Sequence, residues 1–444
     1  MTSEIRVFPR ENGEIQRVVL ARPEGWEALN FFAPTPSEDA FDCFHRIYKL
    51  YLVPAAPWVF GNLVMFRMPE DLPLPESLTK GYDHVADPLT VAAMVLRRGI
   101  VVAGERVIIR NPELKAYWQA LCDRDCVRIV RGNLPTTTII PVSRRAGLLT
   151  QSEPEARMKV NSHFFIMDPF DCATVFDHVG TPFGLMVKDG VVESPPLFSR
   201  EALLVKEDGT VSVECPTLED LRIRIGSWVF VPGENARIYT RPDWFRTPPG
   251  KKALVIIGRK VVAVCKGSIP VPASGFVLCP GENCQIKPGD VVTYEGMEAV
   301  RFGIQVGNSI IRNGEKTERF ISRFFNVKGL HRVAFPPSLY PLDFDHARAG
   351  RIAIGADEAG KPMILWAEGA AKLGHTPGVD SCGASLLEMA QICADVGMRN
   401  AVNLDGGGSA QLLIHNQRSL MISDRKDEDF SESERPVPMG LIVE

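Results

Sequence analysis

Near its C-terminal end the sequence contains a run of seven residues whose types and spacing suit an anion-binding catalytic loop. The run consists of Asn403, Leu404, Asp405, Gly406, Gly407, Gly408 and Ser409. Three consecutive glycines between apolar strands cost stability, because each loses extra backbone entropy on folding. They are useful where the backbone must approach a ligand closely, since successive backbone amides can form a concave site for phosphate. The run therefore predicts a phosphate-binding loop, the alternative being a tight glycine-rich hairpin.

Polar side chains border the three glycines, and apolar strands are expected on both sides, over 401–404 and 410–414. Asp405 supplies a carboxylate at the end of the first strand. Asn403 lies on the same face as Asp405, because side chains alternate along a strand. Ser409 adds a hydroxyl after the glycines. The run is not a Walker loop, since no Gly-Lys-Ser/Thr sequence ends it and no helix follows.

One helix is expected to precede this loop in the sequence. Ser385 and Glu388 have the spacing of a capping box, which predicts that a helix starts here. The helix is expected to span 385–396, with Gly397 as its C-terminal stop. Its buried face would carry Leu386, Met389, Cys393 and Val396.

From about residue 135 the sequence becomes rich in short β-branched runs. They alternate with turn signals such as Asp189-Gly190, Asp208-Gly209 and Pro288-Gly289. An Asp-Gly pair between such runs predicts a hairpin, because both turn positions must tolerate positive φ. The sequence therefore predicts an α+β fold, with a β-rich C-terminal domain over 131–444 and the 385–396 helix packed on a sheet.

The N-terminal part of the chain, over 1–130, alternates helix and strand signals. Strands are expected over 14–20 and 99–110, and helices over 37–52, 88–98 and 112–122. These elements predict a small α/β or α+β accessory domain over 1–130, to which no motif assigns a role.

Bulk composition narrows the class of protein. A chain of 444 residues is too long for one ordinary core, so two domains are expected. The formal net charge of −4 shows no basic excess, which argues against nucleic-acid and membrane-surface partners. Residues 1–10 carry charges and no apolar run, so no signal peptide is expected. No apolar stretch approaches the roughly 20 residues of a membrane-spanning helix.

The ten cysteines are scattered through the chain. In a chain of this size they predict reduced, buried thiols of a cytoplasmic protein rather than a disulfide framework. The closest pairs are Cys122 with Cys126 and Cys279 with Cys284. Neither pair has the spacing of a zinc site, and no pair of histidines accompanies them.

One further cluster has residue types that bind metals: Asp343, Asp345 and His346. An Asp-x-Asp sequence before a strand is more often a solvated loop. No metal and no cofactor are therefore expected, a divalent cation being the alternative.

The segment from Gly383 to Ile414 resembles the signature of the phosphodiester glycosidase family. The family shows a helix followed by Ala-x-Asn-Leu-Asp-Gly-Gly-Gly-Ser, which corresponds here to Ala401 through Ser409. The resemblance covers roughly residues 126–444. Further segments resemble family motifs in the family's order, namely Val160 to Phe165, Phe302 to Gly307, Arg312 to Gly314, Arg351 to Gly355, Trp366 to Gly369 and Arg435 to Val437.

The resemblance implies hydrolysis of a glycosyl-phosphodiester bond, as in the family member that removes N-acetylglucosamine from a phosphodiester. Such cleavage passes through an oxocarbenium-like state and expels a phosphomonoester. We expect Asp405 to be the catalytic carboxylate, Glu368 to be the second carboxylate and His163 to donate a proton. The structural alternatives are a turn glutamate and a core histidine.

Substrate binding is expected from the same segments. Arg351 is the predicted phosphate clamp, because a guanidinium meets phosphate oxygens in a fork. It should line one pocket with the 406–409 loop. Asn161 and Asn403 are expected to bind sugar hydroxyls or phosphate.

Two other functions stay open. One is a non-catalytic module that binds a sugar phosphate or polysaccharide, which the departures from the family pattern at Ser162, Ile352 and Glu368 favour. The other is a metal-dependent phosphodiesterase that breaks the bond on the phosphorus side. In each case the expected partner is a small-molecule or glycan phosphodiester, and the sequence does not indicate an oligomeric state.

Overall fold

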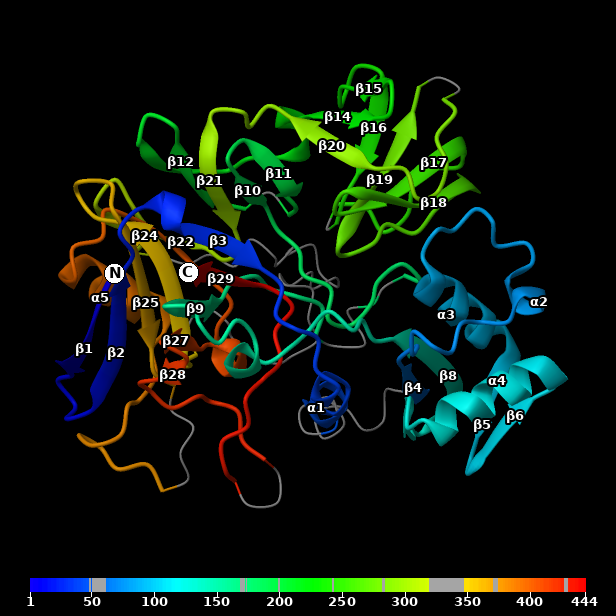
Figure 1. Cartoon of the computed structure of the whole chain (residues 1–444), viewed down its shortest axis with the longest axis horizontal. Coiled ribbons are helices and arrows are strands. Elements are labelled where there is room, and N and C mark those ends of the chain that lie inside the picture. The colour runs from blue at the N-terminus through cyan, green and yellow to red at the C-terminus, as the bar shows by residue number, and fades with distance from the viewer. Residues whose placement is uncertain are drawn as a thin grey trace.

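The structure of the chain is a computed structural model. It describes residues 1–47, 49, 61–167, 172, 174–198, 200–241, 243–281, 284–318, 347–369, 374–426 and 430–444. Strands dominate it and helices are few, as expected for the β-rich C-terminal part (Figure 1). Short 3-10 turns occur at Trp26–Ala28, Leu149–Gln151, Leu218–Asp220 and Gly407–Ser409.

A seven-stranded antiparallel sheet forms one half of the body that holds the glycine loop. Its order is β1-β2-β25-β24-β26-β22-β23. The strands are β1 (Thr2–Pro9), β2 (Ile15–Arg22), β25 (Pro362–Ala367), β24 (Arg351–Ala356), β26 (Asn400–Asn403), β22 (Ser309–Arg312) and β23 (Glu315–Lys316).

Helix α5 (Leu386–Asp395) packs on this sheet, against β22 and β24. Ser385 and Glu388 form the predicted capping box, each side chain bonding the other residue's backbone amide. Gly397 follows with φ +93°, a left-handed conformation that favours glycine and ends the helix. The predicted apolar face is buried, its members being Leu386, Met389, Cys393 and Val396.

A second, five-stranded antiparallel sheet has the order β28-β27-β9-β29-β3. Its strands are β28 (Gln417–Arg418), β27 (Leu412–Ile414), β9 (Met158–Asn161), β29 (Gly440–Val443) and β3 (Leu29–Phe32). One apolar core joins the two sheets and includes Ile352, Trp366 and Val402 from the first and Val160, Leu412 and Leu441 from the second.

The expected domain boundary near residue 130 is wrong for the segment 1–32. Strand β2 pairs with β25, and β3 pairs with β29, so the N-terminal strands complete both sheets of the C-terminal body. Only pairing between the two ends of the chain reveals this. Local periodicity identified β2 as a strand and could not say where it docks.

The remaining N-terminal elements form a small α/β unit around a three-stranded sheet, in the order β7-β4-β8 (Figure 1). The helices expected over 88–98 and 112–122 are present, and the strand segment expected over 99–110 forms a hairpin. The described elements of the unit are α2 (Glu76–Thr79), α3 (Pro88–Gly99), α4 (Pro112–Asp123), β4 (Gly61–Phe66), β5 (Ile100–Ala103), β6 (Arg106–Ile109), β7 (Val127–Val130) and β8 (Leu134–Pro141).

Helix α1 (Asp39–Ile47) lies between this α/β unit and the body with the two sheets (Figure 1). It occupies part of the 37–52 segment for which a helix is expected. Its apolar face, which includes Phe41 and Phe44, enters a core shared with β4 and with the loops after β8. The helix therefore lies where it can reach both parts of the molecule.

Three further antiparallel sheets complete the β-rich region. In the first, Asp189 and Gly190 form the predicted hairpin turn, with φ of +47° and +76°. It contains β11 (Val191–Ser194), β10 (Met186–Lys188), β21 (Val300–Gln305), β12 (Ala202–Lys206) and β13 (Val211–Glu214). The other two contain β15 (Trp228–Phe230), β14 (Arg222–Ile225) and β20 (Val292–Glu295), and β16 (Ala236–Tyr239), β19 (Gly275–Pro280), β17 (Gly250–Ile257) and β18 (Lys260–Gly267).

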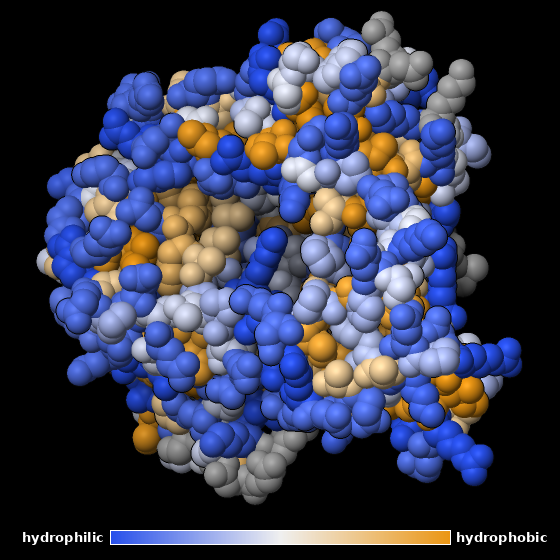
Figure 2. Space-filling model, turned by 45° about the vertical axis from the view of Figure 1, so that its right-hand side comes forward, coloured by the Kyte–Doolittle hydropathy of each residue, from blue (hydrophilic) through white to orange (hydrophobic). Residues whose placement is uncertain are grey.

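The surface is mostly hydrophilic on the face shown in Figure 2, where hydrophobic residues border a central hollow. No helix among the described residues is long and apolar enough to cross a membrane. All ten cysteines lie among the described residues. The expectation that they are buried is wrong for Cys122 and Cys215, which are exposed.

Candidate active site

The glycine loop connects the two sheets of the body. Because β26 lies in the seven-stranded sheet and β27 in the five-stranded one, the loop is not the tight hairpin that was the alternative. The Leu404 amide donates to the Ile352 carbonyl at 2.8 Å, and the Gly407 amide donates to the Gly350 carbonyl at 2.7 Å. Gly407 itself has φ +61° and faces open space. The loop is thus anchored to the start of β24 while its tip stays clear.

The glycines are required partly by the protein's own side chains. A Cβ on Gly408 would collide with the Asp424 carboxylate and the Arg435 guanidinium. A Cβ on Gly406 would lie 2.8 Å from the Gly350 carbonyl oxygen. Two of the three glycines therefore permit close internal packing, a reason different from the close approach of a ligand that the sequence suggested.

Asp405 lies in an unusual environment for a carboxyl group. Its residue is 9% exposed, and burial raises the pKa of the carboxyl from 3.8 to about 7. Hydrogen bonds from the Ser409 hydroxyl and the Gly406 amide, and the charge of Arg435, counteract part of this rise. The nearby Asp424 charge adds to it. A carboxyl with a pKa near neutrality can accept or release a proton at physiological pH.

Beside Asp405 lies a buried ion pair that the sequence did not assign to the site. Arg435 donates two parallel hydrogen bonds to the Asp424 carboxylate, from Nε at 2.6 Å and from Nη2 at 2.8 Å. Its third nitrogen, Nη1, approaches the Ser409 hydroxyl at 3.5 Å. Arg435 belonged to the closing family motif, which was the available signal. Asp424 had no sequence signal of its own.

Asn161 positions the loop rather than facing outward. Its side-chain amide donates to the Asp405 carbonyl at 2.8 Å, and its side-chain oxygen accepts from the Gln411 amide at 3.0 Å. One side chain from β9 therefore ties together both ends of the glycine loop. Both halves of the amide are engaged by backbone, so the sugar-binding role expected for Asn161 does not match these contacts.

In the Asn403 side chain the nitrogen has a hydrogen-bond partner and the oxygen has none among the described residues. Its side-chain nitrogen donates to the Leu404 carbonyl at 2.7 Å. Its side-chain oxygen is buried and has no hydrogen-bond partner among the described residues. An unsatisfied buried acceptor is costly, so this oxygen is a candidate contact for a ligand hydroxyl or amide.

His163 is a buried, neutral side chain. Its Nδ1 lies 3.0 Å from the Ser162 hydroxyl and its Nε2 lies 3.2 Å from the Leu185 carbonyl. Burial lowers its pKa from 6.5 to about 4. An imidazole that is neutral at physiological pH, with both nitrogens engaged, does not suit the proton-donor role expected for it. It fits the core-histidine alternative.

Glu368 is fully occupied by internal partners. One carboxylate oxygen accepts from Arg17 Nε at 2.7 Å, and the other accepts from the Met421 amide at 2.9 Å. The residue is 2% exposed. These contacts match the structural alternative rather than a second catalytic carboxylate, because both oxygens already hold an N-terminal strand and a C-terminal loop in place.

Arg351 lies beside the loop, although the two are far apart in sequence. Its Cδ is 3.6 Å from the position that a Cβ on Gly406 would occupy. Its guanidinium donates to the carbonyls of Ala384 at 3.1 Å and Ala347 at 2.7 Å. The structure therefore brings Arg351 and the loop together, and its role as phosphate clamp stays a prediction.

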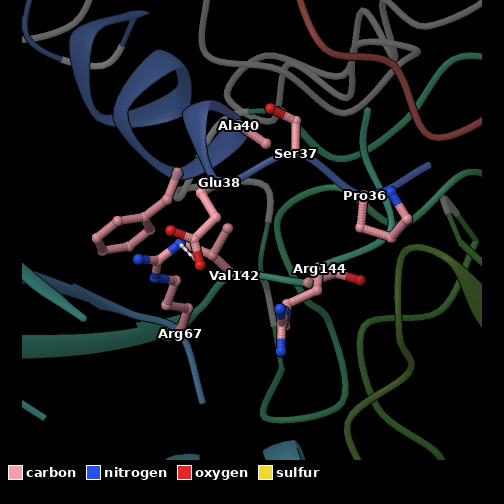
Figure 3. Close-up of a pocket in the computed structure, with 9 residues that line it drawn as sticks. Pro36, Ser37, Glu38, Ala40, Arg67, Val142 and Arg144 are labelled. Atoms are coloured by element: carbon pink, nitrogen blue, oxygen red, sulfur yellow. Dashed lines mark ion pairs between the residues drawn. The ribbon is translucent and has the colours of Figure 1, made fainter. Parts of the chain in front are cut away.

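One surface pocket is lined by residues from none of these groups. It lies at the N-terminal end of α1, where Glu38 and Arg67 form an ion pair at 3.5 Å and Arg144 borders the opening (Figure 3). Its walls contain no residue of the Asp405 cluster, so it does not mark the predicted site.

A metal centre finds no support within the described ranges, where no group of three or more His, Cys, Asp or Glu residues could hold an ion. The candidates Asp343, Asp345 and His346 lie outside the described residues.

Comparisons with known proteins extend these observations. Residues 254–444 match the family model described as phosphodiester glycosidase. This match starts later in the chain than the resemblance noted in the sequence, which covers roughly residues 126–444. No curated protein matches the chain.

Several solved structures match over the whole chain. A hypothetical protein from Synechocystis is 15% identical with a TM-score of 0.42; all of this chain aligns, but it spans only 62% of that protein. The zebrafish N-acetylglucosamine-1-phosphodiester alpha-N-acetylglucosaminidase catalytic domain, auto-inhibited by its pro-peptide, is 11% identical with a TM-score of 0.35, and 100% of this chain and 82% of that chain align. A putative exported protein from Burkholderia pseudomallei is 13% identical with a TM-score of 0.37, with 100% and 96% aligned.

Proposed function

We propose that this chain, whose residues 254–444 form a phosphodiester glycosidase domain, hydrolyses the bond between the anomeric carbon of a sugar and a phosphodiester oxygen. The observation that carries the proposal is the Asp405 carboxyl. It is buried, has a pKa near 7, and lies on a glycine loop that is held from both sheets. A structural aspartate in such a loop would more usually be ionised and capped by amides.

The chemistry can be written with the residues present. A water molecule loses its proton to the Asp405 carboxylate and forms a bond to the anomeric carbon. The bond from that carbon to the phosphate oxygen breaks, and its electron pair leaves with the phosphomonoester. Phosphate is already a fair leaving group, so neutralising its charge matters more than protonating it.

The charges needed for the leaving group lie around the same loop. Arg435 points its Nη1 at the Ser409 hydroxyl, which in turn hydrogen-bonds the Asp405 carboxyl. Arg351 lies against Gly406. Most loop amides are used internally, because those of Gly407, Ser409 and Ala410 donate to backbone carbonyls and that of Gly406 donates to the Asp405 carboxyl, so the anion would be attracted by guanidinium groups more than by the loop amides. The phosphate is proposed to bind at this tip, with the buried Asn403 side-chain oxygen, which is unpartnered among the described residues, as a contact for the sugar.

Oxygen-isotope labelling tests the proposal directly. The purified chain would be incubated in ¹⁸O-labelled water with the methyl diester of N-acetylglucosamine 1-phosphate and with the corresponding glucose and N-acetylgalactosamine diesters. Mass spectrometry of the products should place the label in the sugar. Label in the phosphate would instead indicate a phosphodiesterase, and binding without turnover of any diester would indicate a non-catalytic module.

A further inference from the structure

Helix α1 lies outside the segment that matches the family model, yet it packs against the Asp424–Arg435 pair. Cys43 and Ile47 on this helix pack with Met167, and the Met167 sulfur lies 3.1 Å from Arg435 Nη1. The charges of Arg435 and Asp424 both act on the buried Cys43 thiol. One face of α1 therefore borders the ion pair beside Asp405.

Arg46 on the same helix reaches the segment that carries this pair. Its Nη2 donates to the Ser433 hydroxyl at 2.9 Å and approaches the Cys43 sulfur at 3.6 Å. The Ser433 amide in turn donates to the Asp424 carbonyl at 3.1 Å. The guanidinium of Arg46 is thus connected through a single residue to Asp424.

Arg46 lacks a carboxylate partner among the described residues, as does Arg425 beside Asp424. Arg435 is matched by Asp424, and Arg17 is matched by Glu368. Arg46 has only neutral partners, a hydroxyl and a thiol, among the described residues. It is half-buried, so its field is less screened by water than that of a surface arginine. An anionic ligand would supply the countercharge.

We propose that Arg46 is a substrate-binding residue that holds the phosphate of the diester from the side of α1. The inference rests on the proposed function for its substrate class. It adds that part of the phosphate-binding site is supplied by α1, which lies outside the segment that matches the family model. Arginine suits this task because its planar fork can bind two phosphate oxygens at once.

The test compares Arg46→Gln and Arg46→Lys with Lys49→Gln, which removes an exposed positive charge from the same part of the chain. Binding of inorganic phosphate would be measured by calorimetry, independently of turnover. KM and kcat would be measured on the diester that the wild type cleaves, and thermal unfolding would show that each variant is folded. We expect Arg46→Gln to weaken phosphate binding and raise KM roughly 10-fold or more, in line with a hydrogen bond to a charged group.

The controls separate the outcomes. Arg46→Lys should recover part of the phosphate affinity, since it keeps the charge and loses the fork, and Lys49→Gln should match the wild type. A folded Arg46→Gln variant with unchanged phosphate affinity would overturn the inference. So would a variant that loses thermal stability while its phosphate affinity stays the same, because that pattern indicates a structural contact with Ser433. If the wild type cleaves no diester, the proposed function fails, while phosphate calorimetry still decides the role of Arg46.

Discussion

Asp405 and Glu368 are two buried carboxyl groups for which the sequence predicted catalytic roles. They differ in whether a cation is available to pair with the carboxylate. Glu368 has its own arginine, Arg17, and a backbone amide, one for each oxygen. Asp405 accepts hydrogen bonds from a hydroxyl and an amide, and the nearby guanidinium of Arg435 is already paired with Asp424. Burial alone therefore does not make a carboxylate reactive. What matters is whether a cation is left to compensate its charge in the folded protein.

The largest effect is expected from replacing Asp405. Asp405→Asn keeps the shape and most hydrogen bonding of the side chain but removes the charge and the proton acceptor. We expect kcat on a glycosyl phosphodiester to fall by roughly 10²-fold or more, with the melting temperature changed by only a few degrees. Steady-state kinetics and calorimetric unfolding of one preparation measure both. An unfolded variant would assign Asp405 a structural role, and full activity in a folded one would remove it from the mechanism.

The pH dependence is the next largest effect. Burial raises the pKa of Asp405 to about 7, so its carboxylate, the form that accepts a proton, is lost as the pH falls through that value. We expect kcat/KM to decrease by roughly 10-fold per pH unit below about 7 and to level off above it. His163 does not contribute, because its pKa lies near 4. Rates that rise as the pH falls would mean that Asp405 acts as an acid instead.

Replacing Glu368 should affect stability more than chemistry. Glu368→Gln leaves Arg17 without a countercharge, and we expect a loss of about 1–3 kcal/mol in the free energy of unfolding. The lower part of that range is favoured because the Arg17 side chain is 32% exposed and partly screened by water. Urea unfolding measures the loss, and kcat of the folded variant should stay within about threefold of the wild type, far from the effect of Asp405→Asn. A large loss of kcat with unchanged stability would restore Glu368 as a catalytic carboxylate.

The smallest effect concerns the hydroxyl that stabilises the Asp405 carboxylate. Ser409 lowers the pKa of Asp405 by donating a hydrogen bond, so Ser409→Ala should raise it. The midpoint of the pH–rate profile should move upward by up to about one unit, the size of one such hydrogen bond. The matched control is Ser77→Ala in the small α/β unit, which removes a serine hydroxyl that donates to another carboxylate, that of Glu113, and should leave the midpoint unchanged. A downward movement would contradict the hydrogen bond seen in the structure.

The sequence by itself determined the local features of this protein. The capping box at Ser385 and Glu388 and the glycine at 397 set the ends of α5, because caps depend on residues within one turn of the helix. Asp189 and Gly190 specified their turn, since few residues tolerate positive φ. The motif around Asp405 also identified the loop and indicated the family whose model matches residues 254–444, because its spacing is contiguous.

Only the tertiary structure decided which partners those residues meet. Strands β1, β2 and β3 join sheets whose other members lie far away along the chain, and no local pattern encodes that choice. The same holds for the site. Whether Glu368 meets Arg17, and whether Asp424 takes Arg435 away from Asp405, depends on contacts between distant segments. The pKa of a buried carboxyl follows from those contacts, so its chemistry could not be decided before the chain was folded.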